Sequence, residues 1–164
     1  MIFVTVGTHE QQFNRLVKKM DTLVAKKIIK EEVFIQTGFS SYEPKRCKWS
    51  RWLSFSDMKK KMAEARIVVT HGGPSSFIMP LQMGKIPIVV PRSHEYDEHV
   101  NNHQVNFVKL VTEEQRNIIP IYDVEDLELA IVNYDKITAE MNLEFGSHNE
   151  KFVKNFEKIV DSLF

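Results

Sequence analysis

Short apolar runs alternate along this chain with segments in which apolar residues recur every three or four positions. The run from Ile2 to Val6 predicts a β-strand, and the apolar spacing across residues 10 to 26 predicts an amphipathic helix. The same two patterns predict further strands at Val33 to Gln36, Trp49 to Phe55, Ile67 to Thr70, Ile86 to Val90 and Ile118 to Ile121, and further helices from a Ser56 or Asp57 cap through Ala65, at Ser75 to Met83, at Asn101 to Leu110 and at Val124 to Asn133.

Strands that alternate with helices are joined by right-handed crossovers, which predicts an α/β fold: a Rossmann-like open parallel sheet with helices on both faces. Sheets of this kind bind ligands beyond the carboxyl ends of their strands. In this arrangement the strand-ending loops are Gly7 to His9, His71 to Ser75 and Arg92 to Asn101, and the unusual polar residues of the chain fall there.

Composition describes an ordinary globular domain, with 164 residues, 43% hydrophobic residues and 22 basic against 22 acidic side chains. Zero net charge argues against a nonspecific nucleic-acid binder. The run from Lys45 to Trp52 is a local basic patch, read either as a nucleic-acid contact or as an exposed loop leading into a strand with buried Trp. The lone Cys47 cannot form an internal disulfide, which fits a reducing compartment.

The ends of the chain suggest neither export nor insertion in a membrane, because no signal peptide and no spanning apolar run is evident. Residues 141 to 149 resemble a linker, which predicts one domain over residues 1–140 and a linker with an amphipathic helix over residues 141–164. That helix packs either on the domain's own sheet or on a partner, through a stripe made of Phe152, Val153, Phe156, Ile159, Val160 and Leu163.

The candidate chemistry starts at the turn His71-Gly72-Gly73-Pro74-Ser75-Ser76, because a Gly-rich strand-to-helix turn presents backbone N–H groups and the positive end of a helix dipole to a phosphate. Neither the dinucleotide fingerprint nor the Walker A spacing is present. His99 and His103 are four residues apart and would share a helix face, but position 100 is Val where a zinc peptidase has Glu, so no metal site is expected.

An ordered set of motifs resembles the donor-binding half of GT-B glycosyltransferases. The set comprises Phe3-Val4-Thr5-Val6-Gly7-Thr8, the His71 to Ser76 turn, Gly84-Lys85-Ile86-Pro87-Ile88-Val89-Val90-Pro91 and Asn102-His103-Gln104. Within this group the chain resembles the cytosolic subunits of split enzymes: the eukaryotic UDP-N-acetylglucosamine transferase acting on dolichol-linked sugar and, more nearly, bacterial PssE-type exopolysaccharide and capsule subunits.

The resemblance implies that the donor, a UDP-sugar, is bound without a further cofactor. It implies phosphate contacts from Gly7, Thr8, Gly72, Gly73, Ser75 and Ser76, and sugar or ribose contacts from Asn102, His103 and Gln104. Other interpretations stay open: a plain tight turn at the glycines, a solvated helix start at Asn102 to Gln104, and for His71 either a ligand contact or a satisfied strand-end histidine.

One position departs from the family pattern, because Met79 stands where related donor domains place a ribose-binding glutamate. A thioether cannot replace the hydrogen bonds of a carboxylate. Either Glu95 or Asp97, from the insert before Asn102, supplies the acid, or the nucleotide is held differently, or it is held weakly. The last case implies the alternative function of a noncatalytic stimulatory subunit.

Catalysis of this type needs a base and positive potential for the leaving diphosphate. His9 is the candidate base, and Arg92 or Lys85 would add to the potential of the helix N-terminus, although Arg92 is equally read as a surface charge. The resemblance further implies a cytoplasmic subunit held at the inner face of the membrane by a membrane-anchored, acceptor-binding partner. The expected reaction transfers a sugar, galactose by resemblance, to a lipid-diphosphate-linked oligosaccharide in exopolysaccharide or capsule biosynthesis.

Overall fold

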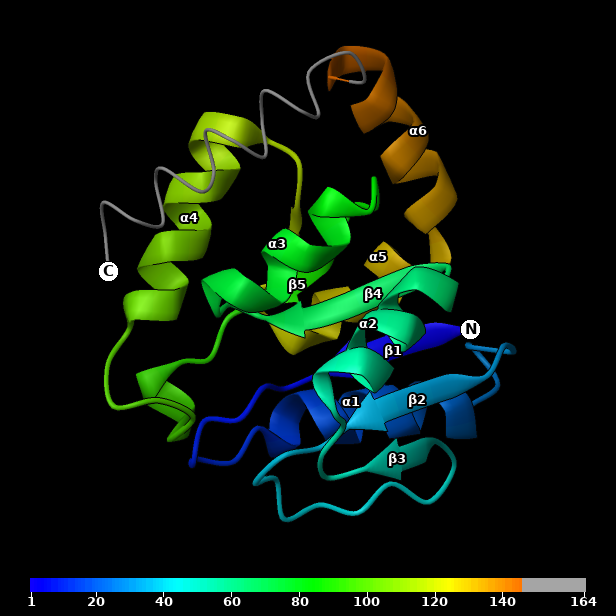
Figure 1. Cartoon of the computed structure of the whole chain (residues 1–164), viewed down its shortest axis with the longest axis vertical. Helices are drawn as coiled ribbons and strands as arrows, with labels where there is room; N and C mark the ends of the chain where they lie inside the picture. Colours follow the sequence, from blue (N-terminus) through cyan, green and yellow to red (C-terminus); the bar gives the residue numbers. More distant parts are fainter. Residues whose placement is uncertain (146–164) are drawn as a thin grey trace.

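The computed structural model describes residues 1–145, which form one α/β domain around a six-stranded sheet (Figure 1). The strands are β1 (Ile2–Thr5), β2 (Val33–Gln36), β3 (Lys48–Ser50), β4 (Ile67–His71), β5 (Ile88–Val90) and β6 (Ile119–Pro120). The helices are α1 (Asn14–Ala25), α2 (Phe55–Glu64), α3 (Pro74–Gln82), α4 (His103–Gln115), α5 (Leu127–Val132) and α6 (Tyr134–Phe145), with 3₁₀ turns η1 (His94–Tyr96) and η2 (Val124–Asp126).

The sheet has the strand order β3-β2-β1-β4-β5-β6, and every neighbouring pair is parallel. The order reverses at β1, from which the chain first builds outward to β3 and then returns to add β4 on the other side. This reversal is the topological switch point at which open α/β sheets bind ligands. The predicted Rossmann-like parallel sheet is therefore confirmed.

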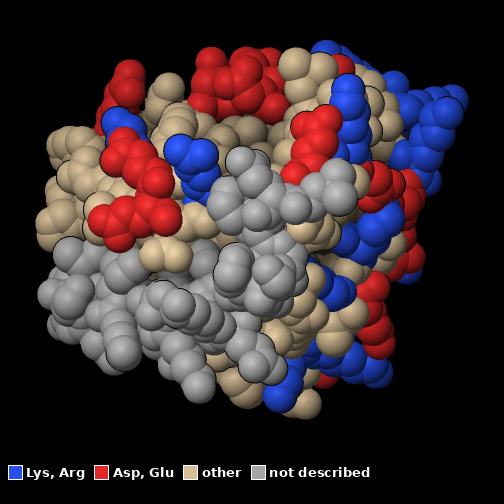
Figure 2. Space-filling model, turned by 90° about the horizontal axis from the view of Figure 1, so that it is seen from above, with Lys and Arg blue, Asp and Glu red and all other residues tan. Residues whose placement is uncertain are grey.

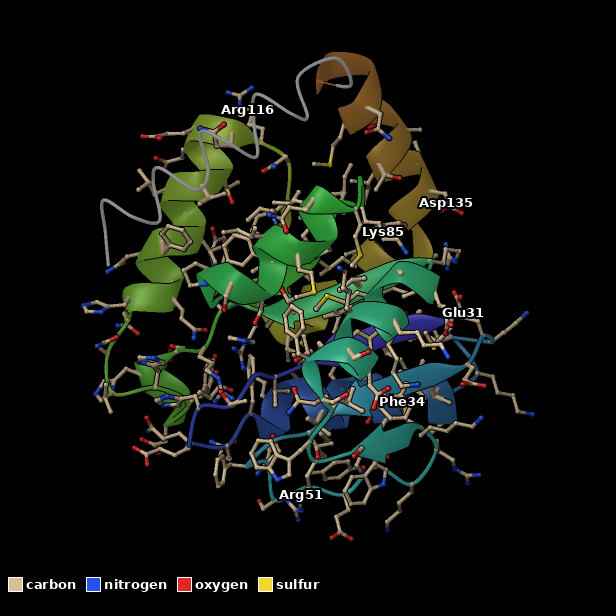
Figure 3. The ribbon with its side chains drawn as sticks, viewed as in Figure 1. Glu31, Phe34, Arg51, Lys85, Arg116 and Asp135 are labelled. Atoms are coloured by element: carbon tan, nitrogen blue, oxygen red, sulfur yellow. The ribbon has the colours of Figure 1, made fainter. Side chains whose placement is uncertain are left out.

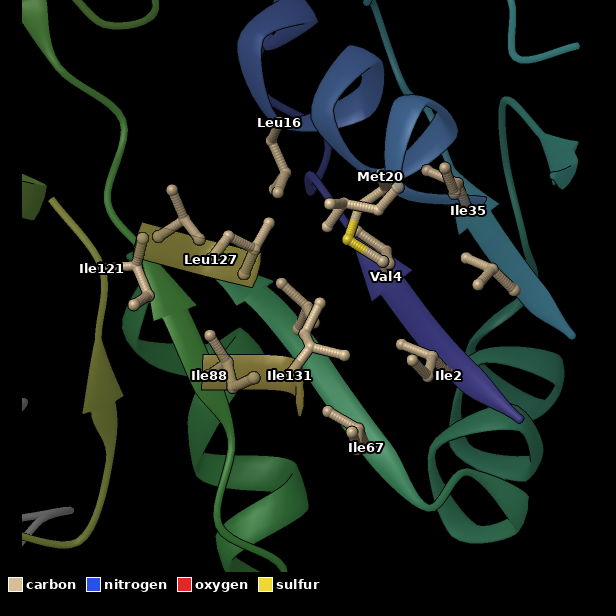
Figure 4. Packing of buried hydrophobic residues seen from close by; sticks show 14 of the residues in the cluster. Ile2, Val4, Leu16, Met20, Ile35, Ile67, Ile88, Ile121, Leu127 and Ile131 are labelled. Atoms are coloured by element: carbon tan, nitrogen blue, oxygen red, sulfur yellow. The ribbon is translucent and has the colours of Figure 1, made fainter. Parts of the chain in front are cut away.

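Side chains that alternate along the strands fill two apolar layers, one on each face of the sheet. Ile2 and Val4 of β1 belong to the larger cluster, which joins the sheet to α1 and α5 (Figure 4). Phe3 points to the opposite face and packs with Met62 of α2, while α3 and α4 form a further cluster around Phe77. Helices thus cover both faces, as the alternation of strands and helices predicts.

Helix α2 begins earlier than the predicted caps. Ser54, rather than Ser56 or Asp57, is the N-cap, and its hydroxyl accepts a hydrogen bond from the backbone N–H of Asp57 over 3.0 Å. Phe55 is the first helical residue and is 72% exposed, so it is not the end of a buried strand. The predicted strand from Trp49 shortens accordingly.

The predicted domain boundary after residue 140 falls within α6, which continues to Phe145. The first residues of the expected linker are therefore helical. The rest of the linker and the apolar stripe from Phe152 to Leu163 lie outside the described residues. Over residues 1–145, no helix combines the length and the apolar character needed to cross a membrane.

Candidate functional site

Three loops meet where the strands end: the loop after β1, the turn from β4 into α3, and the loop from β5 to α4. Figure 1 shows the first and third side by side at the left of the view. Hydrogen bonds join them, since the Gln12 side-chain amide donates to the carbonyl of Tyr96 over 3.0 Å. The sequence prediction that these loops share one edge of the sheet is borne out by the strand order.

His71 ends β4 and is held between backbone and side-chain partners. Its Nδ1 accepts a hydrogen bond from the Gly73 N–H over 3.0 Å, so the neutral ring carries its proton on Nε2, which lies 2.6 Å from the Ser76 hydroxyl. Burial lowers the pKa of His71 to about 3, and the positive charge of Arg92 acts in the same direction. Of the two interpretations left open for His71, its hydrogen bonding fits the satisfied strand-end histidine.

The glycines around His71 make room for its ring. A Cβ added at Gly73 would lie 2.3 Å from the imidazole Cε1, and one at Gly7 would lie 2.4 Å from Nε2. Gly7 also has a φ of +78°, which side chains rarely adopt. Glycine is therefore required at both positions by the packing of His71, whether or not a phosphate binds there.

Gln104, in the first turn of α4, fastens that helix to the glycine turn. Its Oε1 accepts hydrogen bonds from the N–H of Gly72 over 3.1 Å and from the N–H of Arg92 over 3.0 Å. The predicted phosphate donors Gly72 and Gly73 thus already have partners within the protein. A phosphate would have to displace these bonds to use either amide.

Ser75 is the predicted phosphate contact that stays exposed, in the first turn of α3. Within residues 1–145 its hydroxyl has no hydrogen-bond partner. Pro74 precedes it at the start of the helix, where a missing N–H costs nothing. The positive end of the α3 dipole is therefore open at Ser75, and Thr8 of the β1 loop is exposed as well.

Arg92 is completely buried, so it is not a surface charge. Its guanidinium donates to the carbonyls of Val6 over 2.7 Å, Gln11 over 2.9 Å and Glu98 over 3.0 Å. Burial lowers the pKa of Arg92 to about 10, which leaves the side chain charged at neutral pH. Arg92 ties the β1 loop to the β5 loop through its two terminal nitrogens, which are turned to backbone oxygens.

The insert after β5 turns its predicted acids outward. Glu95 and Asp97 are exposed, and Asp97 adopts a left-handed φ of 56° at the end of η1. The third carboxylate of the insert, Glu98, is instead fully buried. It forms a bidentate ion pair with Arg15 of α1, with N–O distances of 3.0 and 3.1 Å.

His9 lies in the β1 loop with its ring stacked on His99, at 4.5 Å between ring centroids and 10° between planes. Its Nε2 is 2.9 Å from Oε1 of Gln11. The prediction that His99 and His103 share a helix face is wrong, because α4 begins at His103 and His99 belongs to the preceding loop. Burial lowers the pKa of His99, and repulsion from His9 contributes to the shift.

The remaining predicted contacts at the start of α4 are exposed. Asn102 accepts a hydrogen bond at Oδ1 from the His94 N–H over 3.0 Å, so it closes the insert onto the helix. His103 carries its side chain on the outer surface. Among residues 1–145, no three metal-binding side chains gather closely enough to hold an ion.

Two positions discussed from the sequence lie away from these loops. Met79 packs against the apolar cluster of Phe3 and Met62, so its thioether belongs to the core of the α2 face. Lys85 donates from Nζ to the carbonyls of Met62 and Ala63 near the end of α2, where the strands begin rather than end (Figure 3). Lys85 therefore supplies no potential to the candidate site.

Sequence reasoning missed a buried network at the end of β2. Oε1 of Gln36 accepts hydrogen bonds from the Thr5 hydroxyl over 2.6 Å and from the Gly7 N–H over 3.2 Å, and its Nε2 donates back to the Gly7 carbonyl over 3.1 Å. This network fixes the path of the β1 loop. The available signal was a polar residue at the end of an otherwise apolar strand.

The chain is similar in sequence and in fold to known proteins. Residues 1–158 match the model of the glycosyltransferase family 28 C-terminal domain, and no curated protein matches the chain. Among solved structures, the glycosyltransferase SnogD from Streptomyces nogalater aligns at a TM-score of 0.52 and 14% identity over 98% of this chain and 43% of SnogD. A de novo designed Rossmann 2x3 fold protein aligns at a TM-score of 0.44 and 7% identity, over 82% of this chain and 88% of the design.

The likeness to SnogD concerns the fold, and this chain spans less than half of that glycosyltransferase. The family match covers nearly the whole chain, including every loop of the candidate site. The chain belongs to the glycosyltransferase family 28 C-terminal domain family.

Proposed function

We propose that the carboxyl edge of the sheet binds the diphosphate of a nucleotide-sugar donor, with the first turn of α3 facing the phosphates. The observation that carries this proposal is the exposed Ser75 at the positive end of α3, within a rigid frame of loops linked by His71, Arg92 and Gln104. A helix N-terminus with an available hydroxyl suits an anion. Thr8 is the exposed predicted donor on the β1 loop.

The donor in this proposal is a UDP-sugar, with galactose as the transferred sugar, and the acceptor is a lipid-diphosphate-linked oligosaccharide. The acceptor is held by a separate membrane-anchored subunit, which keeps this chain at the inner face of the membrane. Support comes from the match of the chain to a C-terminal domain model and from the resemblance to split exopolysaccharide and capsule enzymes.

His9 is the proposed base, acting on the acceptor hydroxyl when the partner is bound. Its ring is partly exposed at the same edge as Ser75, and stacking on His99 together with the contact to Gln11 fixes its orientation. A general base must lie within hydrogen-bond reach of the proton that it removes, and a ring of defined orientation favours this. Asn102, His103 and the acids Glu95 and Asp97 are exposed along this edge and are proposed sugar or ribose contacts.

A second candidate function is that of a noncatalytic stimulatory subunit. It is favoured by the internal hydrogen bonds of the Gly72 and Gly73 amides, and by the thioether of Met79 in place of a ribose-binding acid. In this case the partner holds the active site, and the chain acts on its stability or position.

Calorimetric titration of UDP, UDP-galactose and UDP-N-acetylglucosamine, into the protein alone and with the partner, separates the two functions. Donor binding predicts saturation by UDP that weakens about tenfold in Ser75→Ala, the loss expected for one hydrogen bond to a charged group. Ser56→Ala is the matched control, because Ser56 is an exposed serine in the first turn of α2. Absence of saturable binding even with partner present would overturn the donor-binding proposal.

A further inference from the structure

A cluster of aromatic side chains is exposed at one end of the sheet, beyond the carboxyl ends of β2 and β3. Phe39 is 50% exposed, Trp52 is 46% exposed and Phe55 is 72% exposed. Phe39 and Trp52 meet edge to face, with 5.0 Å between ring centroids. Of the two tryptophans in the predicted strand, Trp49 is partly buried, whereas Trp52 projects from the fold.

The backbone beneath these rings is fixed. The Gly38 N–H donates to the Arg51 carbonyl over 3.0 Å, and the Arg51 guanidinium donates to the carbonyls of Gly38 and Ser40, on either side of Phe39. Gly38 has a φ of +54°, and a Cβ there would lie 2.7 Å from the carbonyl oxygen of Gly7. The aromatic side chains are therefore held in solvent by a preformed scaffold rather than by a loose loop.

The positive charge of the chain is concentrated in the segment that contains Trp52 and Phe55. Residues 45–61 contain seven basic side chains and one acidic one, Asp57, for a net charge of +6, while the whole chain is neutral with 22 of each sign. The remaining residues therefore carry 15 basic and 21 acidic groups, a net charge of −6. Acidic and basic side chains are interspersed on the face opposite β3, as Figure 2 shows.

Residues 45–61 run through the edge strand β3 and the first turns of α2, so their charges flank one side of the molecule. Figure 3 shows Arg51 at the outer margin of that side. Lys59 follows Phe55 by one helical turn and is exposed, as is Lys60. The ion pair of Lys48 with Glu32 joins two exposed side chains, and the Arg51 to Glu43 distance of 3.9 Å is long, so neither neutralises this side strongly.

We propose that this surface, defined by Phe39, Trp52 and Phe55 with the basic residues of segment 45–61, docks directly on an anionic lipid bilayer. Aromatic rings bordered by Lys and Arg are suited to the membrane interface, where the rings enter the headgroup region and the cations meet lipid phosphates. The charge complementarity favours an anionic bilayer over an apolar protein partner. The contact goes beyond tethering through a partner subunit, since the chain itself touches the lipid.

Docking through this surface would fix the orientation of the proposed donor site relative to the bilayer. The aromatic rings project from the edge at which the strands end, which is also the edge of Ser75 and His9. Docking would turn this edge toward the bilayer and bring it near a lipid-linked acceptor. The lipid contact itself does not require donor binding.

Co-sedimentation of the full chain, without any partner, tests the contact. The probes are vesicles of phosphatidylcholine alone and of phosphatidylcholine with phosphatidylglycerol. We expect binding to the anionic vesicles, weakened at high salt, and at least a tenfold loss in Trp52→Ser/Phe55→Ser and in Lys59→Glu/Lys60→Glu. The matched controls are Leu129→Ser/Val132→Ser, at exposed apolar residues, and Lys26→Glu/Lys30→Glu, at exposed lysines away from the patch; both should bind normally.

Quenching of tryptophan fluorescence by brominated lipid provides a second readout, which should be strong in the native chain and reduced in Trp52→Phe. Equal binding to both kinds of vesicle, no binding, or unchanged binding in the patch variants would overturn the proposal. Self-association of the native chain without lipid that is lost in Trp52→Ser/Phe55→Ser would also overturn it, because a second copy would then be the occupant. UDP titration of the same patch variants tests the donor site independently. Loss of lipid binding with an unchanged affinity for UDP would concern the docking surface alone.

Discussion

The Gly73 N–H donates to Nδ1 of His71 over 3.0 Å, and this hydrogen bond requires the imidazole to be neutral on that nitrogen. Protonation of Nδ1 would leave the amide without an acceptor in a fully buried setting. The turn between β4 and α3 therefore contains a titratable group that folding keeps uncharged.

Acidification should destabilise the protein through His71. The pKa of its ring is about 3 in the folded chain against 6.5 in the unfolded chain, so between these values the unfolded state binds more protons. Stability is then retained above pH 6.5 and lost as the pH falls below it, by up to about 1.4 kcal/mol per pH unit for this group. Urea unfolding at pH 7.5 and 5.5 measures the loss, to which the lowered pKa of His99 adds.

His71→Gln keeps an acceptor for Gly73 and a donor for Ser76 without a titrating ring, so it should flatten this pH dependence. His94→Gln is the control at an exposed histidine and should leave the dependence unchanged. An equal slope in the native chain and in His71→Gln would contradict the assignment.

Gly73→Ala should destabilise the fold because its methyl group meets the His71 ring. The φ of Gly73 is −71°, which alanine adopts freely, so the clash is the main cost and should reach about 2 kcal/mol. A double-mutant cycle with His71→Ala, read by urea unfolding, should show strong coupling, since removing the ring creates the space that the methyl needs. Additive losses would argue that the ring and the glycine act separately.

Gln104→Ala should weaken both stability and UDP binding. It leaves the Gly72 and Arg92 amides without their shared acceptor, at a cost of about 2 to 4 kcal/mol for two unsatisfied donors. Thermal unfolding measures the first effect and calorimetry the second. Asn106→Ala, at an exposed position of the same helix, should change stability by less than about 0.5 kcal/mol.

Arg92→Lys should destabilise the protein although it keeps the charge. One ammonium cannot reach the carbonyls of Val6, Gln11 and Glu98 together, as the planar guanidinium does, so we expect a loss of about 2 to 4 kcal/mol. Chemical denaturation measures it, with Arg46→Lys as the exposed control. A loss no larger than that of the control would show that the carbonyls find other donors.

If the proposed function holds, His9→Gln should lower kcat by about 100-fold in the enzyme reconstituted with the proposed partner, while the affinity for UDP stays the same. The change removes the proposed base but not the phosphate contacts. His94→Gln serves as a control, at an exposed histidine of the loop between β5 and α4 that has no role in the proposed reaction. An unchanged kcat would remove His9 from the mechanism and favour the stimulatory function.

The order of strands and helices could be predicted from the sequence because each fully buried strand begins with three consecutive apolar residues. The ends of elements were less predictable, since they depend on individual hydrogen bonds. Ser54 rather than Ser56 caps α2, and this choice places Phe55 in solvent. Tyr134 begins a further helix, α6, that was not predicted, and its last residues lie in the segment that was assigned to a linker from residue 141.

The loops of the site were placed correctly, but the roles of several residues could not be predicted. The glycine turn was interpreted through phosphate binding, whereas Gly7 and Gly73 are required by the ring of His71, which is distant from Gly7 in sequence. Glu95 and Asp97 were chosen as the candidate acids of the insert. The buried ion pair of Glu98 was not predicted, because its partner Arg15 lies 83 residues away in the sequence. Such pairings depend on tertiary contacts that no local pattern reveals.

The clasp formed by Arg92 and by the pair of Arg15 with Glu98 has a consequence for engineering and for evolution. It joins the β1 loop, the first turns of α1 and the β5 insert into one mechanical unit. A chimera that exchanges only one of these segments for that of a relative with another specificity would leave an unpaired buried charge. Donor preference in this scaffold should therefore be transplanted, or drift between lineages, as a block of two distant segments rather than loop by loop.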